Sequence, residues 1–217
     1  MIVDERVSCY IKSLTAYNSD FLEKLREKAL EAKVPIIKRE TESFLKTLLL
    51  LKKPKRILEV GAAVAYSSLV MAETLEGNVK ISTIENYEKR VLEARKNIKD
   101  SHYSNIIHLI EEDASKVLKE LVEKEEKYDF IFMDAAKGQY INWLEPVIKL
   151  LNKEGVLCSD NVLQGGDIVQ SRYLIERRDR SIHSRLREYL YELTHREELS
   201  TTILSLGDGV ALTVLKK

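Results

Sequence analysis

Residues 57–67 read ILEVGAAVAYS, a short apolar run followed by a turn of small residues in which a helix opens. Further apolar runs of strand length follow at 79–84, 106–110, 128–134 and 156–160, and amphipathic stretches of helix length separate them. This alternation is typical of successive βα units, which build a parallel sheet covered by helices. The sequence therefore predicts an α/β fold with five parallel strands.

The segments on either side of this core predict helices before it. Helical spacing of apolar residues indicates one helix at 4–15 and a second that opens at a capping box from Asp20 to Glu23. A third amphipathic helix is expected to end before Pro54, because proline does not continue a helix.

The C-terminal part predicts a polar helix and a hairpin. The long polar region at 166–196 indicates a helix. Beyond it, 201–206 and 210–215 flank Gly207-Asp208-Gly209, a turn short enough to join antiparallel strands. We therefore expect a hairpin at the edge of the sheet.

The composition is that of a soluble globular protein. Hydrophobic residues make up 44% and charged residues 32%, and the formal net charge is zero, which excludes a disordered chain and a general bias toward nucleic acid. Cys9 and Cys158 match neither a disulfide framework nor a zinc site. The sequence has no membrane span or leader pattern, so we expect a cytoplasmic protein. We expect a single domain over 1–217, with N-terminal helices in 1–53 and a Rossmann-like core in 54–217.

The ends of the first two strands favour a nucleoside cofactor. In open parallel sheets, ligands bind beyond the carboxyl ends of the strands, and Gly61 opens a turn where a backbone can approach one. The dinucleotide fingerprint has glycines where Ala63 and Ala65 stand, so a smaller nucleoside fits better. Glu85 ends the second strand, where an acidic side chain accepts hydrogen bonds from ribose hydroxyls. The alternative is that the small residues only pack the helix on the strand.

Polar residues also follow the third, fourth and fifth strands. Asp113, before Ala114, either reaches an adenine amine or caps a helix. Asp134 ends the fourth strand, and Asp160 and Asn161 end the fifth. Three side-chain oxygens at neighbouring strand ends suit a hard cation such as Mg²⁺ or Mn²⁺, although either segment alone could merely cap a loop.

Three segments, 59–67, 133–140 and 159–162, resemble those of the catechol and caffeoyl-CoA type O-methyltransferases, and the resemblance spans nearly the whole chain. It implies a class I methyltransferase with a seven-stranded sheet, mostly parallel with an antiparallel C-terminal hairpin. It also implies S-adenosylmethionine as cofactor and a homodimer with the N-terminal helices at or near the interface. One departure is Ala65, which stands where the family usually has glycine before Tyr66 and Ser67.

The resemblance also implies roles for individual residues. Asp134, Asp160 and Asn161 would bind the cation, and Lys137 would act with Asp134 beside the nucleophilic oxygen. The implied cofactor-binding residues are Val34, Glu59, Gly61, Ser67, Glu85, Asp113, Ala114 and Asp134. Two neighbouring substrate oxygens would chelate the cation, so that the ionised hydroxyl points at the sulfonium methyl.

Within this family, the segments 34–37, 134–140 and 177–183 look most like the bacterial tRNA 5-hydroxyuridine methyltransferases. Independently, arginines gather between 172 and 187, where they either neutralise phosphates or form a solvated helix face. The predicted RNA-binding residues are Arg177, Arg178, Arg180 and Arg185.

The leading hypothesis is therefore methylation of 5-hydroxyuridine in a tRNA anticodon loop to 5-methoxyuridine. The alternative is a small-molecule O-methyltransferase of the catechol or caffeoyl-CoA type. A dehydrogenase is disfavoured because Ala63 and Ala65 interrupt its glycine fingerprint, and a pure binding module has no use for Lys137 beside three oxygen ligands.

Overall fold

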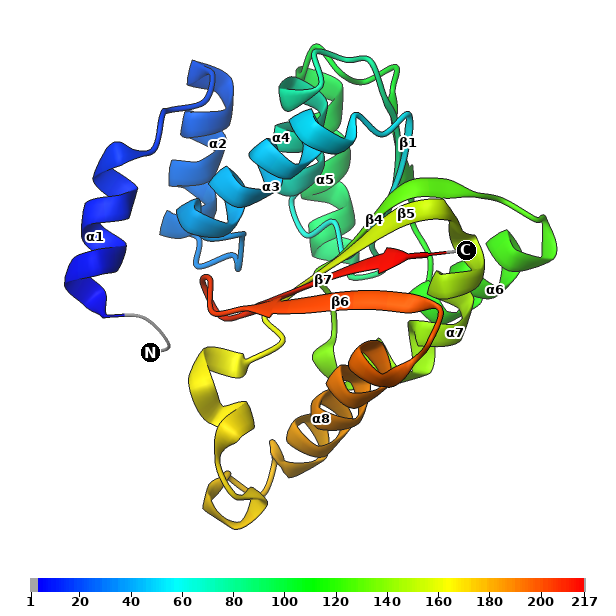
Figure 1. Ribbon diagram of the computed structural model, residues 1–217. Helices are drawn as coiled ribbons and strands as arrows, with labels where there is room; N and C mark the ends of the chain where they lie inside the picture. Colours follow the sequence, from blue (N-terminus) through cyan, green and yellow to red (C-terminus); the bar gives the residue numbers. More distant parts are fainter. Residues whose placement is uncertain (1–3, 217) are drawn as a thin grey trace.

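A computed structural model of the chain describes residues 4–216 and contains one mixed seven-stranded sheet (Figure 1). The strand order is β3-β2-β1-β4-β5-β7-β6. The strands are β1 (Arg56–Val60), β2 (Lys80–Ile84), β3 (Ile107–Ile110), β4 (Tyr128–Met133), β5 (Leu151–Asp160), β6 (Leu199–Leu204) and β7 (Val210–Leu215). Neighbouring strands among β1–β5 pair in parallel, whereas β7 is antiparallel to both β5 and β6. The predicted Rossmann-like sheet with its C-terminal hairpin is confirmed.

Helices cover both faces of this sheet, and the alternation along β4 explains why. Phe130 and Phe132 point into the core on one face, while Ile131 and Met133 point into the core on the other. The helices of the first face are α2 (Asp20–Glu31), α3 (Arg39–Lys52), α4 (Tyr66–Thr74) and α5 (Glu88–Asp100). Those of the second face are α6 (Ala114–Glu123), α7 (Tyr140–Leu150) and α8 (Arg180–His195). A strand buried on both faces reads as a continuous apolar run, as the sequence of β4 does.

Helix α1 (Glu5–Leu14) lies on the outside of the molecule, beside α2 and α3 (Figure 1). None of its residues is buried, and the large side chains of Tyr10 and Leu14 are exposed. The homodimer implied by the resemblance stays a prediction, and this apolar surface is compatible with it. Among residues 4–216, no helix is long and apolar enough to cross a membrane.

Two predicted features of the helices are wrong. The long helix expected at 166–196 begins only at Arg180, after two short 3-10 helices, η2 (Gln164–Val169) and η3 (Arg172–Leu174). Gly165 and Gly166 have φ values of 63° and 107°, so the backbone there is left-handed and cannot be part of an α-helix. The capping box at the start of α2 is also absent: Ser19 is the N-cap residue, and Glu23 instead pairs with Arg39.

The order of the strands reverses between β1 and β4, which makes their carboxyl ends the expected place for a ligand. The two ends lie side by side, since the Asp134 amide donates to the Val60 carbonyl at 3.0 Å. Gly61 has a φ of 100°, and a Cβ atom there would lie 2.2 Å from the Asp134 carbonyl oxygen. Only glycine fits where the two backbones approach so closely, and this approach places Asp134 directly beside the turn after β1.

Candidate active site

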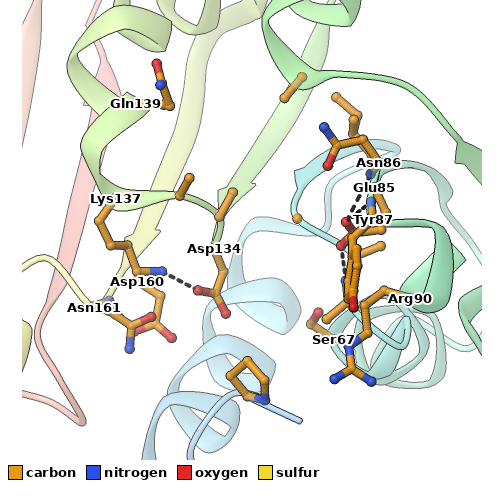
Figure 2. Close-up of a pocket in the computed structure, with 18 of the residues that line it drawn as sticks. Ser67, Glu85, Asn86, Tyr87, Arg90, Asp134, Lys137, Gln139, Asp160 and Asn161 are labelled. Carbon is orange, nitrogen blue, oxygen red and sulfur yellow. Dashed lines mark hydrogen bonds and ion pairs between the residues drawn. The ribbon is translucent and has the colours of Figure 1, made fainter. Parts of the chain in front are cut away.

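A cavity of about 920 Å³ opens at the carboxyl ends of the strands (Figure 2). This volume is in the range of pockets that enclose small ligands and cofactors. Its walls are the turn after β1, the ends of β2 and β3, the segment after β4, Asp160 at the end of β5 and Asn161 after it, the segment 35–38 and Asp208. The sequence-predicted residues Gly61, Ser67, Glu85, Asp113, Ala114, Asp134, Lys137, Asp160 and Asn161 all line it.

Glu85 lies at one end of the cavity and is tied to the turn after β1. Its Oε2 accepts a hydrogen bond from the Ala63 amide at 2.9 Å, and its Oε1 accepts from the amides of Asn86 and Tyr87 at 3.0 and 2.9 Å. A carboxylate has about four acceptor sites, so these bonds leave room for a further donor. Glu85 therefore orders the turn and still presents an acceptor to the cavity.

Asp113 has the capping role that the sequence left open. Its Oδ1 accepts from the Ser115 amide at 2.9 Å at the start of α6, so the N-cap interpretation is confirmed. The residue also lines the cavity, so the adenine contact stays a prediction. Trp143 of α7 lines the same region and donates from Nε1 to Ser115 Oγ at 2.9 Å. No sequence pattern pointed to this tryptophan as a site residue, because an apolar position on a helix indicates only core packing.

Asp134 and Lys137 form an ion pair at the opposite end of the cavity. The Lys137 Nζ lies 2.6 Å from Asp134 Oδ1 and 3.3 Å from the Tyr140 hydroxyl. Tyr140 is fully buried at the start of α7, and its hydroxyl donates to the Met133 carbonyl at 2.9 Å. Burial raises the pKa of this phenol well above its usual range, so it stays neutral. Tyr140 thereby braces the turn that carries Asp134 and Lys137.

Asp160 and Asn161 lie next to this ion pair, at the end of β5. Asp160 is almost completely buried, and this burial, together with the nearby Asp134 carboxylate, raises its pKa. The Asn161 Nδ2 lies 3.5 Å from Asp208 Oδ2, while Lys38 Nζ lies 2.8 Å from Asp208 Oδ1. In the sequence, Asp208 indicates only the hairpin turn, whereas the fold brings it to the cavity wall.

Two predicted cofactor residues do not line the cavity. Val34 packs in the hydrophobic core, and the four residues that follow it line the wall instead. Glu59 is fully buried under the turn, where its Oε2 accepts from the hydroxyls of Ser68 and Thr83. Burial raises the pKa of Glu59 to about 7. Strand and helix packing turns both side chains into the core, and contact of Val34 or Glu59 with the cofactor stays a prediction.

The four arginines predicted to bind RNA do not line the cavity either, and three of them are bound within the protein. Arg178 pairs with Glu176 and Asp179, and Arg180 donates to the carbonyls of Ile175 and Tyr173. Arg185 donates to the Gly138 carbonyl at 3.1 Å, which ties α8 to the short helix η1 (Lys137–Gln139). Arg177 is exposed.

The donor set beside Lys137 consists of two carboxylates and one amide. Throughout residues 4–216, no group of three or more His, Cys, Asp or Glu side chains is close enough together to hold a metal ion. The predicted set differs from such a group because its third member, Asn161, offers an amide oxygen. Carboxylate and amide oxygens are the ligands that Mg²⁺, Ca²⁺ and Mn²⁺ prefer, so the donor chemistry fits a hard divalent cation.

Comparison with known proteins gives the family. A model of the O-methyltransferase family matches residues 12–217. Catechol O-methyltransferase of Niastella koreensis is 30% identical over 76% of each chain, and flavonoid 3',5'-methyltransferase of Vitis vinifera is 30% identical over 96% of this chain and 93% of its own. An SAH-bound methyltransferase structure from Podospora anserina superposes with a TM-score of 0.87 at 26% identity, covering 98% of this chain and 95% of that one. The chain therefore belongs to the O-methyltransferase family, as an S-adenosylmethionine-dependent enzyme of the catechol and caffeoyl-CoA type.

Proposed function

We propose that this enzyme methylates one of two neighbouring oxygens on a small aromatic molecule of catechol type, with Mg²⁺ or Mn²⁺ beside it. The observation that carries the proposal is the convergence of Asp134, Lys137, Asp160 and Asn161 at one end of a cavity whose other end holds Glu85. The names of the catechol and flavonoid methyltransferases among its relatives support the same substrate class.

The charges at this end of the cavity support a bound cation. Asp134 and Asp160 bring two carboxylates together, and Asp160 is almost completely buried. A divalent cation held by both carboxylates and the Asn161 amide oxygen would offset this charge. When bound, it would hold two neighbouring substrate oxygens and stabilise the ionised hydroxyl.

Lys137 is placed to act on the proton of that hydroxyl. Its ammonium is held between Asp134 and the Tyr140 hydroxyl, and the side chain is only 20% exposed. In its neutral amine form the lysine would take up this proton and become an ammonium, whereas as an ammonium it would instead neutralise the negative charge on the ionised oxygen before the methyl transfer. Direct in-line transfer then requires no covalent intermediate with the protein.

Cofactor binding at the Glu85 end is testable by substitution. We expect Glu85→Ala to weaken S-adenosylhomocysteine binding by about 1–3 kcal/mol, because a charged acceptor for the ribose hydroxyls is lost. Isothermal titration calorimetry measures this change. Glu88→Ala, an exposed carboxylate in the first turn of α5, is the control and should bind like the parent. Unchanged affinity of the Glu85 variant would remove this residue from the cofactor site.

The tRNA substrate predicted from the sequence stays a prediction, and the comparisons favour the small-molecule alternative. The relatives named above are called catechol and flavonoid methyltransferases. In addition, Arg178 pairs with two carboxylates, and Arg180 and Arg185 donate to backbone carbonyls, so fewer of their N–H groups are free to contact phosphates. These contacts fit the alternative interpretation, in which the arginines belong to a solvated surface and bind no phosphate.

A comparison of separate substrates distinguishes the two functions. The purified enzyme with S-adenosylmethionine and Mg²⁺ should methylate a catechol, and it should act far more slowly on the matched monophenol, which lacks the second oxygen. Transfer RNA containing 5-hydroxyuridine is the parallel substrate, with mass spectrometry as the readout. Methylation of the RNA but not the catechol, lost in the Arg177→Ala/Arg178→Ala double variant, would reverse the proposal.

A further inference from the structure

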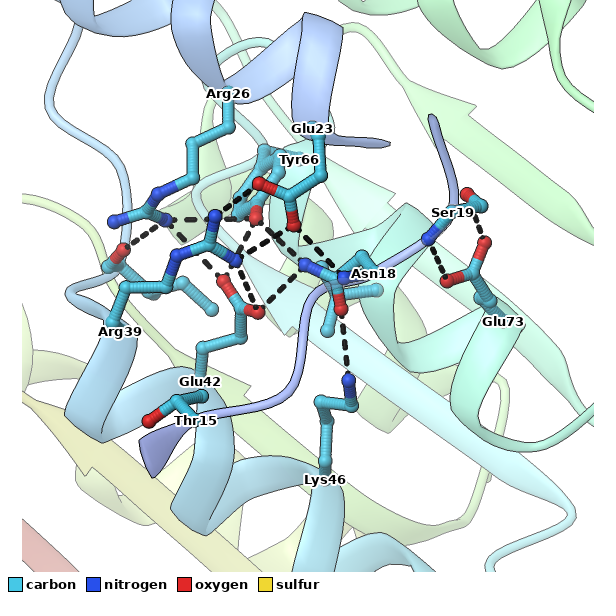
Figure 3. Close-up of polar contacts among 12 residues, drawn as sticks. Thr15, Asn18, Ser19, Glu23, Arg26, Arg39, Glu42, Lys46, Tyr66 and Glu73 are labelled. Atoms are coloured by element: carbon cyan, nitrogen blue, oxygen red, sulfur yellow. Dashed lines mark hydrogen bonds and ion pairs between the residues drawn. The ribbon is translucent and has the colours of Figure 1, made fainter. Parts of the chain in front are cut away.

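A buried cluster of charged side chains lies between the N-terminal helices and the start of α4 (Figure 3). At its centre is Glu42 of α3, which is fully buried. Its carboxylate accepts hydrogen bonds from Asn18 Nδ2 and the Tyr66 hydroxyl, both at 2.7 Å, and from Arg39 and Arg26 at 3.2 and 3.3 Å. A buried carboxylate needs such compensation, and here the donors come from four separate segments of the chain.

Tyr66 links this cluster to the turn after β1. Burial and the adjacent Glu42 carboxylate raise the pKa of its phenol above the usual range, so the hydroxyl stays protonated and donates to Glu42. Tyr66 is also the first residue of α4 and lines the cavity. The phenol therefore fixes the carboxyl-terminal end of the turn to α3.

The turn itself contains two alanines in left-handed conformations. Ala63 has a φ of 46° and Ala65 a φ of 63°, a region that is unfavourable for residues with a Cβ atom. Such a conformation persists where surrounding contacts hold it. Glu85 holds the amide of Ala63, and Asn97 donates to the carbonyl of Val64. Directly after Ala65, the side chain of Tyr66 anchors the turn through its hydrogen bond to Glu42.

The same cluster reaches a second segment of the cavity wall. Arg26 Nη1 donates to the Ile37 carbonyl at 3.1 Å as well as to Glu42. Ile37 belongs to the segment 35–38, which also lines the cavity. One buried cluster thus contacts both the turn and the segment 35–38.

We infer that Tyr66 and Glu42 are positioning residues for the cofactor: the buried cluster holds the strained turn at Ala65 in the shape that receives S-adenosylmethionine. Neither residue needs to touch the reacting atoms. If the anchor is lost, Ala65 relaxes to an unstrained conformation, and cofactor binding must restore the strained one. This inference rests on the proposed cofactor site and adds a cause for its geometry.

Tyr66→Phe removes only the hydroxyl, and we expect it to raise the Kd for S-adenosylhomocysteine roughly tenfold, the cost of re-forming one left-handed alanine. Glycine adopts that conformation without strain, so Ala65→Gly in the Tyr66→Phe background should recover most of the affinity. Ala65→Gly alone should leave the Kd within about twofold of the parent, because its turn is already held. Titration calorimetry well below the melting temperature measures all four proteins.

A matched control separates positioning from general stability. Ser19 donates to Glu73 in the last turn of α4, so Ser19→Ala loosens the other end of the same helix. We expect it to lower the melting temperature without changing the Kd. The inference is overturned if Tyr66→Phe also changes only the melting temperature, or if Ala65→Gly fails to recover affinity. The proposed cofactor site fails by a different result, unchanged binding in Glu85→Ala.

Discussion

Replacing Lys137 with methionine is expected to lower kcat by about 10²–10⁴-fold, the usual contribution of a positioned acid or base. Methionine keeps the apolar length of the side chain but removes the ammonium that lies 2.6 Å from Asp134 Oδ1. Affinity for S-adenosylhomocysteine should change little, because Glu85 and the turn after β1 lie at the other end of the cavity (Figure 2). Steady-state kinetics with a catechol, together with calorimetry, measures both quantities.

Lys137→Arg distinguishes the two roles of the lysine. Arginine keeps the positive charge beside Asp134, but it does not give up its proton in proteins. If the lysine acts as a base, the arginine variant should be nearly as slow as Lys137→Met; if it acts by charge alone, much of the rate should return. A methionine variant with the kcat of the parent enzyme would exclude both roles.

Asp160→Ala is expected to lower methyl transfer by at least about a thousandfold, since a bound cation contributes several kcal/mol of charge stabilisation in the transition state. Binding of Mn²⁺, followed by calorimetry, should be lost, while S-adenosylhomocysteine still binds. A chelator should abolish the activity of the parent enzyme, and added Mg²⁺ should restore it. Asp100→Ala, an exposed aspartate at the end of α5, is the control and should leave all three measurements unchanged.

The pH dependence of cation binding gives a second check on the same site. Burial and the nearby Asp134 raise the pKa of Asp160, so this carboxyl must lose a proton before it can bind a cation. The affinity for Mn²⁺ should therefore rise as the pH rises through the pKa of Asp160 and fall on acidification. Full activity in excess chelator, or an affinity for Mn²⁺ that does not change with pH, would contradict the metal site.

The sequence by itself determined the strands and the places where their chemistry is delivered. An apolar run buried on both faces, such as 128–133, is a local pattern that can be read from the sequence. The direction of the chain then shows that the polar residue following each run lies at the carboxyl end of that strand. Because all parallel strands present their carboxyl ends at one edge, Glu85, Asp134 and Asp160 could be assigned to one site before their distances were known. The helix boundary at Arg180 was missed, since polar composition does not reveal the left-handed glycines before it.

The tertiary structure decided which polar groups meet across long stretches of chain. Arg185 donates to the carbonyl of Gly138, 47 residues away. At the cavity wall, Asp208 accepts a hydrogen bond from Lys38, which lies 170 residues earlier in the chain. No local pattern encodes such a pair, because an arginine that donates to a distant carbonyl and one that contacts only solvent look alike in sequence. The buried position of Glu42 was equally hidden, because a glutamate in the first turn of a helix indicates a surface residue. Packing of α2, α3 and α4 removes water from it, and these helices together with Asn18 supply its four donors.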